Sequence, residues 1–149
     1  MIGLLQRVSQ ASVTVGGETV ARIGPGLLVL AAVQRGDGST QARRLAERLV
    51  NYRVFPDQDG RMNVSVKDHG GEILLVPQFT LAANTRKGTR ASFARAADPA
   101  LGADLFERLA TEIEALHGPA AMGVFGADMQ VELINDGPVT FWIDTGKNE

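Results

Sequence analysis

Cysteine is absent from this sequence, and the chain has only two histidines, one tryptophan and one tyrosine. Without cysteine the chain can form no disulfide, no thiolate metal site and no cysteine nucleophile. The histidines, His69 and His117, stand far apart in the sequence, so they do not provide the spacing of a metal-ligand pair. We therefore expect a protein that uses neither a metal nor a cofactor.

Long apolar runs are also missing. No stretch approaches the length of a membrane span, and Met1 to Arg7 read as a strand without a signal-peptide cleavage pattern. We therefore expect a cytoplasmic protein that has no membrane partner. The formal net charge is −2, so any contact with a nucleic acid would have to use a local basic patch rather than the charge of the whole molecule.

The first part of the chain has the pattern of a β-rich protein. Its 149 residues, without repeat or linker, predict a single domain over residues 1–149. The unbroken apolar run from Leu27 to Val33 predicts a strand that is covered on both faces. The strands that we expect are residues 2–8, 12–15, 18–23, 27–33 and 72–76.

Two segments have the spacing of amphipathic helices. The first begins at Ser39 or Thr40 and ends at Asn51, with apolar residues at i, i+3, i+4, i+7 and i+8. The second covers residues 98–116, with Asp98 as its N-cap and Pro99 as its first helical residue. His117 falls in its last turn, which favours a role at the helix end over a catalytic one.

Residues 52–55 and 62–66 read as two strands joined by the turn 56–60. Asp57, Asp59 and Gly60 resemble part of a calcium loop, but the glycine is at the wrong offset and the final bidentate Glu is missing. We therefore expect a hairpin here, and we expect His69 in the loop that follows.

Residues 135–140, Asn-Asp-Gly-Pro-Val-Thr, lie between two runs that alternate as strands do. An Asp-Gly pair in this setting predicts a hairpin turn, because glycine tolerates the positive φ that tight turns require. The proline that follows is unusual for a plain hairpin, because it has no N–H for the ladder. The Gly137–Pro138 bond is also one of the few in the chain that can readily be cis.

The most basic stretch of the chain is residues 82–95, where Arg86, Lys87, Arg90 and Arg95 occur with no acidic residue before Asp98. Such a loop can follow a phosphate backbone, although solvated surface charge explains the composition equally well. The only hydroxyl in a suggestive position is that of Thr80, at the end of a strand beside the neutral Gln78. Without a nearby base it is a poor nucleophile, so the side chains alone do not name a reaction.

Several motifs together make the sequence similar to the D-aminoacyl-tRNA deacylase family, also described as the D-Tyr-tRNA(Tyr) deacylase family. The resemblance extends over essentially the whole chain and is carried by residues 6–15, 78–81, 85–88, 123–131 and 135–140. The family's usual motif is Ser-Gln-Phe-Thr-Leu, whereas this chain has Pro77 in the place of the serine. That change removes a hydroxyl and a backbone N–H. A related branch has Pro-Gln-Ala-Thr-Leu, but Phe79 argues against membership of that branch.

The resemblance implies an α+β fold, namely a compact barrel-like β structure of mainly antiparallel strands with two helices, assembled as a homodimer. It implies hydrolysis of the ester that joins a D-amino acid to tRNA, and of the same ester where glycine is mischarged on tRNA(Ala). The partner would be aminoacyl-tRNA, and not DNA.

The resemblance also implies a site. In that family the Gly137–Pro138 pair is cis, enters the partner subunit's pocket and leaves no room for an L side chain, while Arg7 braces it. The catalytic positions would be Gln78, Phe79 and Thr80, acting largely through main-chain groups and assisted by a ribose hydroxyl of the tRNA. The remaining implied positions are Pro77, Phe125 and Met129 for the substrate, and Arg86, Lys87 and Arg90 for the tRNA.

Two other functions remain open from the residues alone. The chain could be a module that binds the end of a tRNA without turnover, through its basic loop. It could also be a hydrolase in which Thr80 acts as a covalent nucleophile.

Overall fold

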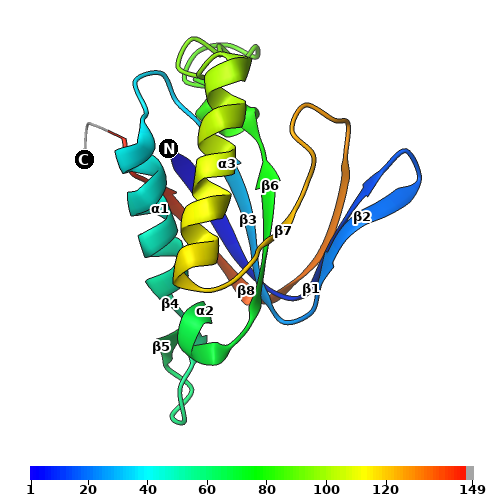
Figure 1. Ribbon diagram of the computed structural model, residues 1–149, viewed down its shortest axis with the longest axis vertical. Helices are drawn as coiled ribbons and strands as arrows, with labels where there is room; N and C mark the ends of the chain where they lie inside the picture. Colours follow the sequence, from blue (N-terminus) through cyan, green and yellow to red (C-terminus); the bar gives the residue numbers. More distant parts are fainter. Residues whose placement is uncertain (147–149) are drawn as a thin grey trace.

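The structure is a computed structural model that describes residues 1–146. Three strands come first in the chain, and the two long helices follow at separate points in the sequence (Figure 1). The elements are β1 (Ile2–Val15), β2 (Glu18–Ile23), β3 (Gly26–Ala32), α1 (Ser39–Asn51), β4 (Arg53–Pro56), β5 (Met62–Ser65), α2 (Val66–His69), β6 (Glu72–Pro77), the 3₁₀ turn η1 (Phe79–Ala82), α3 (Pro99–Leu116), β7 (Ala121–Met122) and β8 (Gln130–Asp144).

One six-stranded sheet curls into a nearly closed, barrel-like shape. Its order is β2-β1-β3-β6-β7, and β8 pairs with the long strand β1. The pairs β3–β6 and β6–β7 are parallel and the others are antiparallel, so the sheet is mixed but its pairing is mainly antiparallel, as expected. The β3–β6 pair is parallel because a long connection, made of α1, β4, β5 and α2, carries the chain back to the start of the sheet between these two strands. The α+β class is confirmed.

Apolar side chains cover both faces of this sheet. On one face Leu27 and Val29 of β3 pack under α1 and α3, which lie side by side (Figure 1). On the other face Leu28 packs against Leu74 and Val76 inside the curl. The apolar run at residues 27–33 is therefore covered on both faces, as its composition predicts.

Both long helices form where the sequence predicts them. The carboxylate of Asp98 accepts a hydrogen bond from the backbone N–H of Leu101 at 2.9 Å, so the predicted N-cap of α3 is in place. His117 is the C-cap residue of α3, and its Nε2 lies 2.7 Å from the carbonyl oxygen of Gly71. Within residues 1–146 no helix combines the length and the apolar character needed to cross a bilayer.

A third, short helix was not expected. α2 begins at Val66, which the sequence had assigned to a strand, because the Ser65 hydroxyl accepts a hydrogen bond from the N–H of Asp68 at 3.1 Å and starts a turn. His69 is the last residue of this helix rather than a loop residue, and its ring stacks on Phe55 with centroids 4.1 Å apart. β4 and β5 do form the predicted hairpin.

The hairpin prediction at residues 135–140 is wrong. The runs before and after the Asp-Gly pair belong to one strand, β8, and both pair with β1. Val8 pairs with Asn135 and Gln6 pairs with Thr140, so residues 136–139 lie opposite Arg7 alone. We call residues 136–139 the β8 bulge. The chain leaves its partner strand briefly and then returns to it, because β1 is long enough to accept both runs.

Candidate active site

A groove of about 1080 Å³ opens where β6 ends. η1, the start of α3 and the segment between β7 and β8 form its other walls. Its lining is mainly apolar and contains the four aromatic side chains of Phe79, Phe93, Phe106 and Phe125, which is the usual character of a ligand site. The lining residues are Gln6, Leu28, residues 30–33, Arg35, Gly36, residues 76–79, Phe93, residues 96–99, Leu101, Gly102, Phe106, residues 125–129, Val131 and Leu133.

The end of β6 places Pro77, Gln78 and Phe79 in the groove. The N–H of Gln78 donates to the carbonyl oxygen of Ala31 at 2.8 Å, which continues the ladder with β3. Pro77, the last residue of β6, has no N–H to donate to a ladder. On the other edge of β6, the pairing with β7 ends with the hydrogen bond from the Gly123 N–H to the Leu75 carbonyl at 2.9 Å.

Thr80 lies in η1 and not on a strand end, as the sequence had suggested, and it does not line the groove. Its hydroxyl donates to the side-chain oxygen of Gln78 at 2.6 Å. A carboxamide oxygen is a hydrogen-bond acceptor but not a base, so this contact orients the two side chains without activating the hydroxyl.

Phe125 and Met129 meet Pro77 and Gln78 in the groove although they lie far along the chain. They belong to a short, self-bonded segment: the N–H of Val124 donates to the Met129 sulfur at 3.4 Å, and the N–H of Ala127 to the Val124 carbonyl at 3.2 Å. On the other wall, the rings of Phe79 and Phe93 are 5.3 Å apart, which is a favourable separation for tilted aromatic rings.

The β8 bulge stands outside this groove. Arg7 holds it by donating from Nε to the carbonyl oxygen of Asp136 at 2.8 Å, and the same guanidinium donates to the Val54 carbonyl at 2.7 Å. The Gly137–Pro138 bond is cis, as the sequence allowed. Arg7, Gly137 and Pro138 are all absent from the lining of the groove. One copy of the described chain therefore brings together Pro77, Gln78 and Phe79 with Phe125 and Met129, but not with the β8 bulge.

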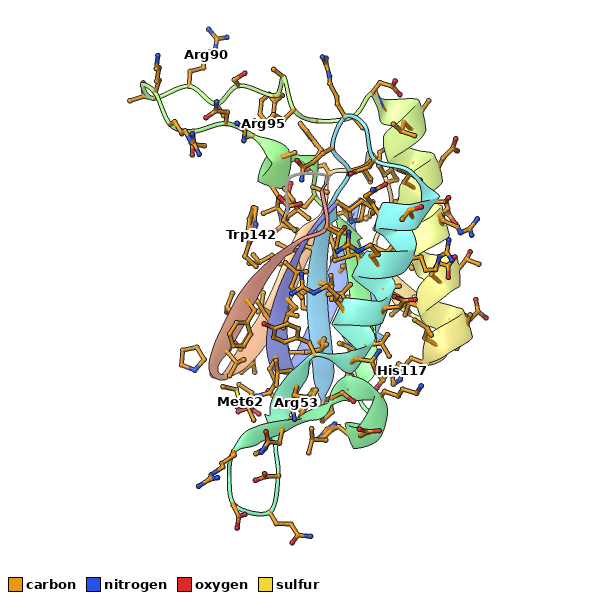
Figure 2. All side chains as sticks on the ribbon, turned by 90° about the vertical axis from the view of Figure 1, so that its left-hand side faces the viewer. Arg53, Met62, Arg90, Arg95, His117 and Trp142 are labelled. Carbon is orange, nitrogen blue, oxygen red and sulfur yellow. The ribbon has the colours of Figure 1, made fainter. Side chains whose placement is uncertain are left out.

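The basic residues lie at one end of the molecule, in the loop between η1 and α3 (Figure 2). Asn84 and Ser92 exchange two backbone hydrogen bonds, of 2.8 and 3.0 Å, and close the tip of this loop. Arg86, Lys87 and Arg90 are exposed, and Arg90 projects from the tip. None of these three lines the groove, but the same loop carries Phe93 into it.

Charged groups in the groove are few. They are Arg35, Asp98 and Asp128, and the Asp98 carboxylate is engaged in capping α3. Over residues 1–146 the structure contains no group of three acidic or histidine side chains that could hold a metal ion. The arrangement can therefore bind and orient a ligand through apolar, aromatic and main-chain groups, but it does not present the acid–base pair of a conventional hydrolase.

Among the residues that line the groove without being predicted from the sequence are Phe93 and Gly102. Phe93 follows the basic loop and carries no signal of its own. Gly102 does carry one, since a glycine inside a helical pattern often marks a close approach of another group.

The fold and the groove define a class: a barrel-like α+β protein with an aromatic groove at the end of a parallel strand pair. The family model described as D-Tyr-tRNA(Tyr) deacylase matches residues 4–144. The chain therefore belongs to the D-Tyr-tRNA(Tyr) deacylase family.

Named relatives and solved structures are similar to this chain over nearly its whole length. The chain is 61% identical over 144 residues to a D-aminoacyl-tRNA deacylase of Thioalkalivibrio sulfidiphilus, covering 97% of both chains. It is 62% identical to that of Alkalilimnicola ehrlichii, covering 97% of this chain and 96% of the relative. A solved structure described as c-Myc DNA unwinding element binding protein superposes with a TM-score of 0.94 at 36% identity, covering 98% of this chain and 99% of that chain. A probable eukaryotic D-amino acid tRNA deacylase, 19% identical, shares the fold with a TM-score of 0.83 over 96% of this chain and 98% of that chain.

Proposed function

We propose that this chain is an enzyme that hydrolyses the ester bond between a D-amino acid and the terminal ribose of tRNA. The observation that carries the proposal is the similarity over nearly the whole chain, at 61% and 62% identity, to proteins named D-aminoacyl-tRNA deacylase. Water adds to the ester carbonyl, the carbon–oxygen bond to the ribose breaks, and the ribose oxygen takes up a proton. The products are free tRNA and the free amino acid.

The catalytic groups are the main-chain atoms around Gln78, Phe79 and Thr80. The first N–H groups of a helical turn have no partner within that turn, and η1 begins at Phe79 beside the groove. Such donors can stabilise the negative oxygen of a tetrahedral intermediate, and each good donor contributes roughly 3–4 kcal/mol to a transition state of this kind. A neighbouring ribose hydroxyl of the tRNA supplies the proton transfer for which the groove provides no histidine or glutamate.

Selection against L-amino acids comes from exclusion by the β8 bulge of a second copy. Residues 136–138 of the bulge are exposed and the bulge lies outside the groove of its own chain, which supports a role in the groove of a partner. Large apolar side chains elsewhere on the surface support a homodimer, because Phe79 is 59% and Trp142 is 53% exposed in the single chain. Trp142 projects from β8 on the side of the sheet away from the helices (Figure 2).

The same exclusion rule makes glycine a substrate. Glycine has no side chain on either side of its α-carbon, so a site that rejects the L side chain by bulk cannot reject it. The proposed partners are therefore D-aminoacyl-tRNA and glycyl-tRNA, and the proposed location is the cytoplasm. Arg86, Lys87 and Arg90 contact the tRNA, and DNA is not a partner.

A deacylation assay with D-Tyr, L-Tyr and Gly esters of tRNA tests this proposal. We expect turnover of the D-Tyr and Gly esters and survival of the L-Tyr ester. Binding of all three esters without turnover would instead establish a module that only binds the tRNA end. An acyl adduct trapped on Thr80 would establish covalent catalysis. A parallel binding measurement with duplex DNA is expected to show no specific complex.

A further inference from the structure

Two arginines meet where the basic loop joins the body of the molecule. The backbone N–H of Arg35, in the connection from β3 to α1, donates to the backbone carbonyl of Arg95 at 2.9 Å. Beside them, Gln34 and Ala96 form an antiparallel bridge. Opposite residues in antiparallel pairing have Cα atoms about 4.5–5.5 Å apart, so two long cationic side chains start from neighbouring points. We call Arg35 and Arg95 the arginine pair.

The backbone that carries the arginine pair is held by local hydrogen bonds. The Asp37 carboxylate accepts a hydrogen bond from the N–H of Gln34 at 2.7 Å, which closes the turn around Arg35. Residues 93–96 form a second turn, around Arg95, which is closed by a backbone hydrogen bond of 3.0 Å. Both arginines are exposed and start from fixed points, so binding of a ligand there does not require the backbone to become ordered first.

The protein does not compensate the charges of the arginine pair. Two like charges on opposite residues repel each other. Over residues 1–146, neither guanidinium forms an ion pair or donates a hydrogen bond. The two carboxylates nearby in the sequence are already engaged, because Asp37 also pairs with the amino group of Met1 at 2.9 Å and Asp98 caps α3. An anion from outside the protein would offset the repulsion.

The position of the arginine pair indicates which anion it would bind. Arg35 lines the groove, whereas Arg95 belongs to the basic loop. Figure 2 shows Arg95 closer to the sheet and the helices than Arg90, which marks the tip of the loop. A strand of nucleic acid with its end in the groove and its body against the loop passes the arginine pair. Each link of such a strand carries a phosphate, and a guanidinium group binds phosphate through two parallel hydrogen bonds.

We propose that the arginine pair binds a phosphate of the single-stranded end of the tRNA, between the groove and the tip of the basic loop. This inference rests on the proposed function, because it takes the aminoacylated end to lie in the groove. The arginine pair contacts a link between nucleotides and not the ester, so it positions the substrate without taking part in the reaction. Arg86, Lys87 and Arg90 then contact phosphates that are further from the ester.

The test uses two small substrates that have the same ester but differ in their phosphates. D-tyrosyl-adenosine has no phosphate, and the D-tyrosyl ester of the trinucleotide CpCpA has two. Arg35→Gln and Arg95→Gln should each raise KM for the trinucleotide ester about tenfold or more, because a charge-assisted hydrogen bond is lost. KM for the adenosine ester should not change. The salt dependence of KM for the trinucleotide ester should fall by about 0.7 units of log–log slope for each phosphate that is no longer neutralised.

Two further variants separate the phosphate contact from other effects. Arg61→Gln, at an exposed position in the β4–β5 turn, removes the same charge at the other end of the molecule and should leave both KM values unchanged. Arg35→Lys keeps the charge but not the two parallel hydrogen bonds, so its KM should lie between those of the wild type and Arg35→Gln. The melting temperature of Arg35→Gln should stay the same or rise, since a repulsion is removed.

Two results would overturn the inference while leaving the proposed function in place. The first is an equal rise of KM for both esters, or one as large in Arg61→Gln, which would attribute the effect to the fold or to total charge. The second is an active wild type with an unchanged KM for the trinucleotide ester in either Arg35→Gln or Arg95→Gln.

If the wild type hydrolyses neither small ester, the arginine pair is judged by the binding of fluorescently labelled CpCpA that carries no amino acid. Binding about tenfold weaker in Arg35→Gln and Arg95→Gln, but not in Arg61→Gln, would retain the phosphate site. Equal binding in all of these variants would reject it. Failure to hydrolyse D-Tyr-tRNA as well would reject the proposed function separately.

Discussion

The Thr80 hydroxyl has no base beside it among residues 1–146, so its suggestive position in the sequence does not make it a nucleophile. Its proton is donated to the Gln78 amide oxygen, and it lies outside the lining of the groove. We predict that Thr80→Ala retains activity within about tenfold of the wild type, because main-chain donors remain when the hydroxyl is removed. Single-turnover deacylation of D-Tyr-tRNA measures this. A folded Thr80→Ala protein that falls to the uncatalysed rate would instead make Thr80 the nucleophile.

Individual site residues were predictable only in part. The cap at Asp98 could be read directly, because capping is a local rule that involves neighbours in the sequence. The meeting of Gln78 with Phe125 and Met129 could not be read from spacing, since tertiary packing alone brings these segments together. Resemblance to a family supplied those positions, and it offered no reason for Gly102, which only the contact with Phe125 explains.

At the scale of elements, the β8 bulge is held by the side chain of Asn135. Its Oδ1 accepts from the N–H of Val139 at 2.7 Å, and its Nδ2 donates to the Thr140 hydroxyl at 2.9 Å and to the Val139 carbonyl at 3.3 Å. These bonds join the two ends of the bulge, where the ladder with β1 is interrupted. Asn135 thus gives Val139, at the end of the bulge, hydrogen bonds that the interrupted ladder does not supply.

We predict that Asn135→Ala lowers deacylase activity at least about tenfold, because small displacements of a positioning element have large effects on rate. The stability loss should be only about 1–3 kcal/mol, the usual effect of removing a few partly exposed hydrogen bonds. Asn51→Ala removes a comparable exposed bond, to the Glu47 carbonyl at 2.8 Å, and is the matched control. Equal activity of the two variants would show that the bulge needs no such brace.

The turn of the β4–β5 hairpin provides a second prediction for one element. Hydrogen bonds from the Asn63 side chain and from the Arg61 backbone hold the pKa of Asp57 below its ordinary value. A pKa lowered by folding means that the charged carboxylate stabilises the folded state above the unfolded pKa of about 3.9, and that this contribution is lost as the pH falls further. Asp57→Asn should therefore lower the melting temperature at neutral pH. The difference from the wild type should shrink towards pH 3, and a constant difference across this range would contradict the assignment.

The elements themselves were predictable where their signals are local. α1 and α3 follow from apolar spacing, and β3 follows from its apolar run. The hairpin expected at residues 135–140 failed because an alternating pattern shows that a segment is a strand but not which strand it pairs with. Likewise, α2 has four residues, too few for helical periodicity, and only the cap at Ser65 marks it.

At the scale of the whole molecule, the basic loop and the β4–β5 hairpin lie at opposite ends (Figure 2). We predict that charge reversal at Arg86, Lys87 or Arg90 weakens tRNA binding. It should reduce the salt dependence by about one unit of log–log slope for each phosphate that the substituted side chain no longer neutralises. Arg61→Glu, in the hairpin turn, changes the net charge equally and should have much less effect. Equal effects at the two ends would mean that the tRNA responds to total charge rather than to the loop.

The last prediction concerns whether residues of two subunits together form each active site. If each groove is completed by the partner's β8 bulge, a subunit with a damaged bulge should complement one with a blocked groove. Gly137→Ala damages the bulge, because a Cβ atom there would lie 2.7 Å from Val139 Cγ2 at a φ of +147°. Gln78→Trp blocks the groove. Mixed dimers, isolated with two different affinity tags, are assayed on D-Tyr-tRNA.

A mixed dimer of these two single variants should retain about half of the wild-type activity, since the intact groove of one subunit meets the intact bulge of the other. Conversely, a subunit that carries both changes, paired with a wild-type subunit, should be nearly inactive, because each groove or its partner bulge is then damaged. A site contained within one chain gives the reverse pattern, with no activity in the first pairing and about half in the second. The two pairings together therefore decide between the arrangements, and the reverse pattern would reject the cross-subunit site while leaving the deacylase reaction unaffected.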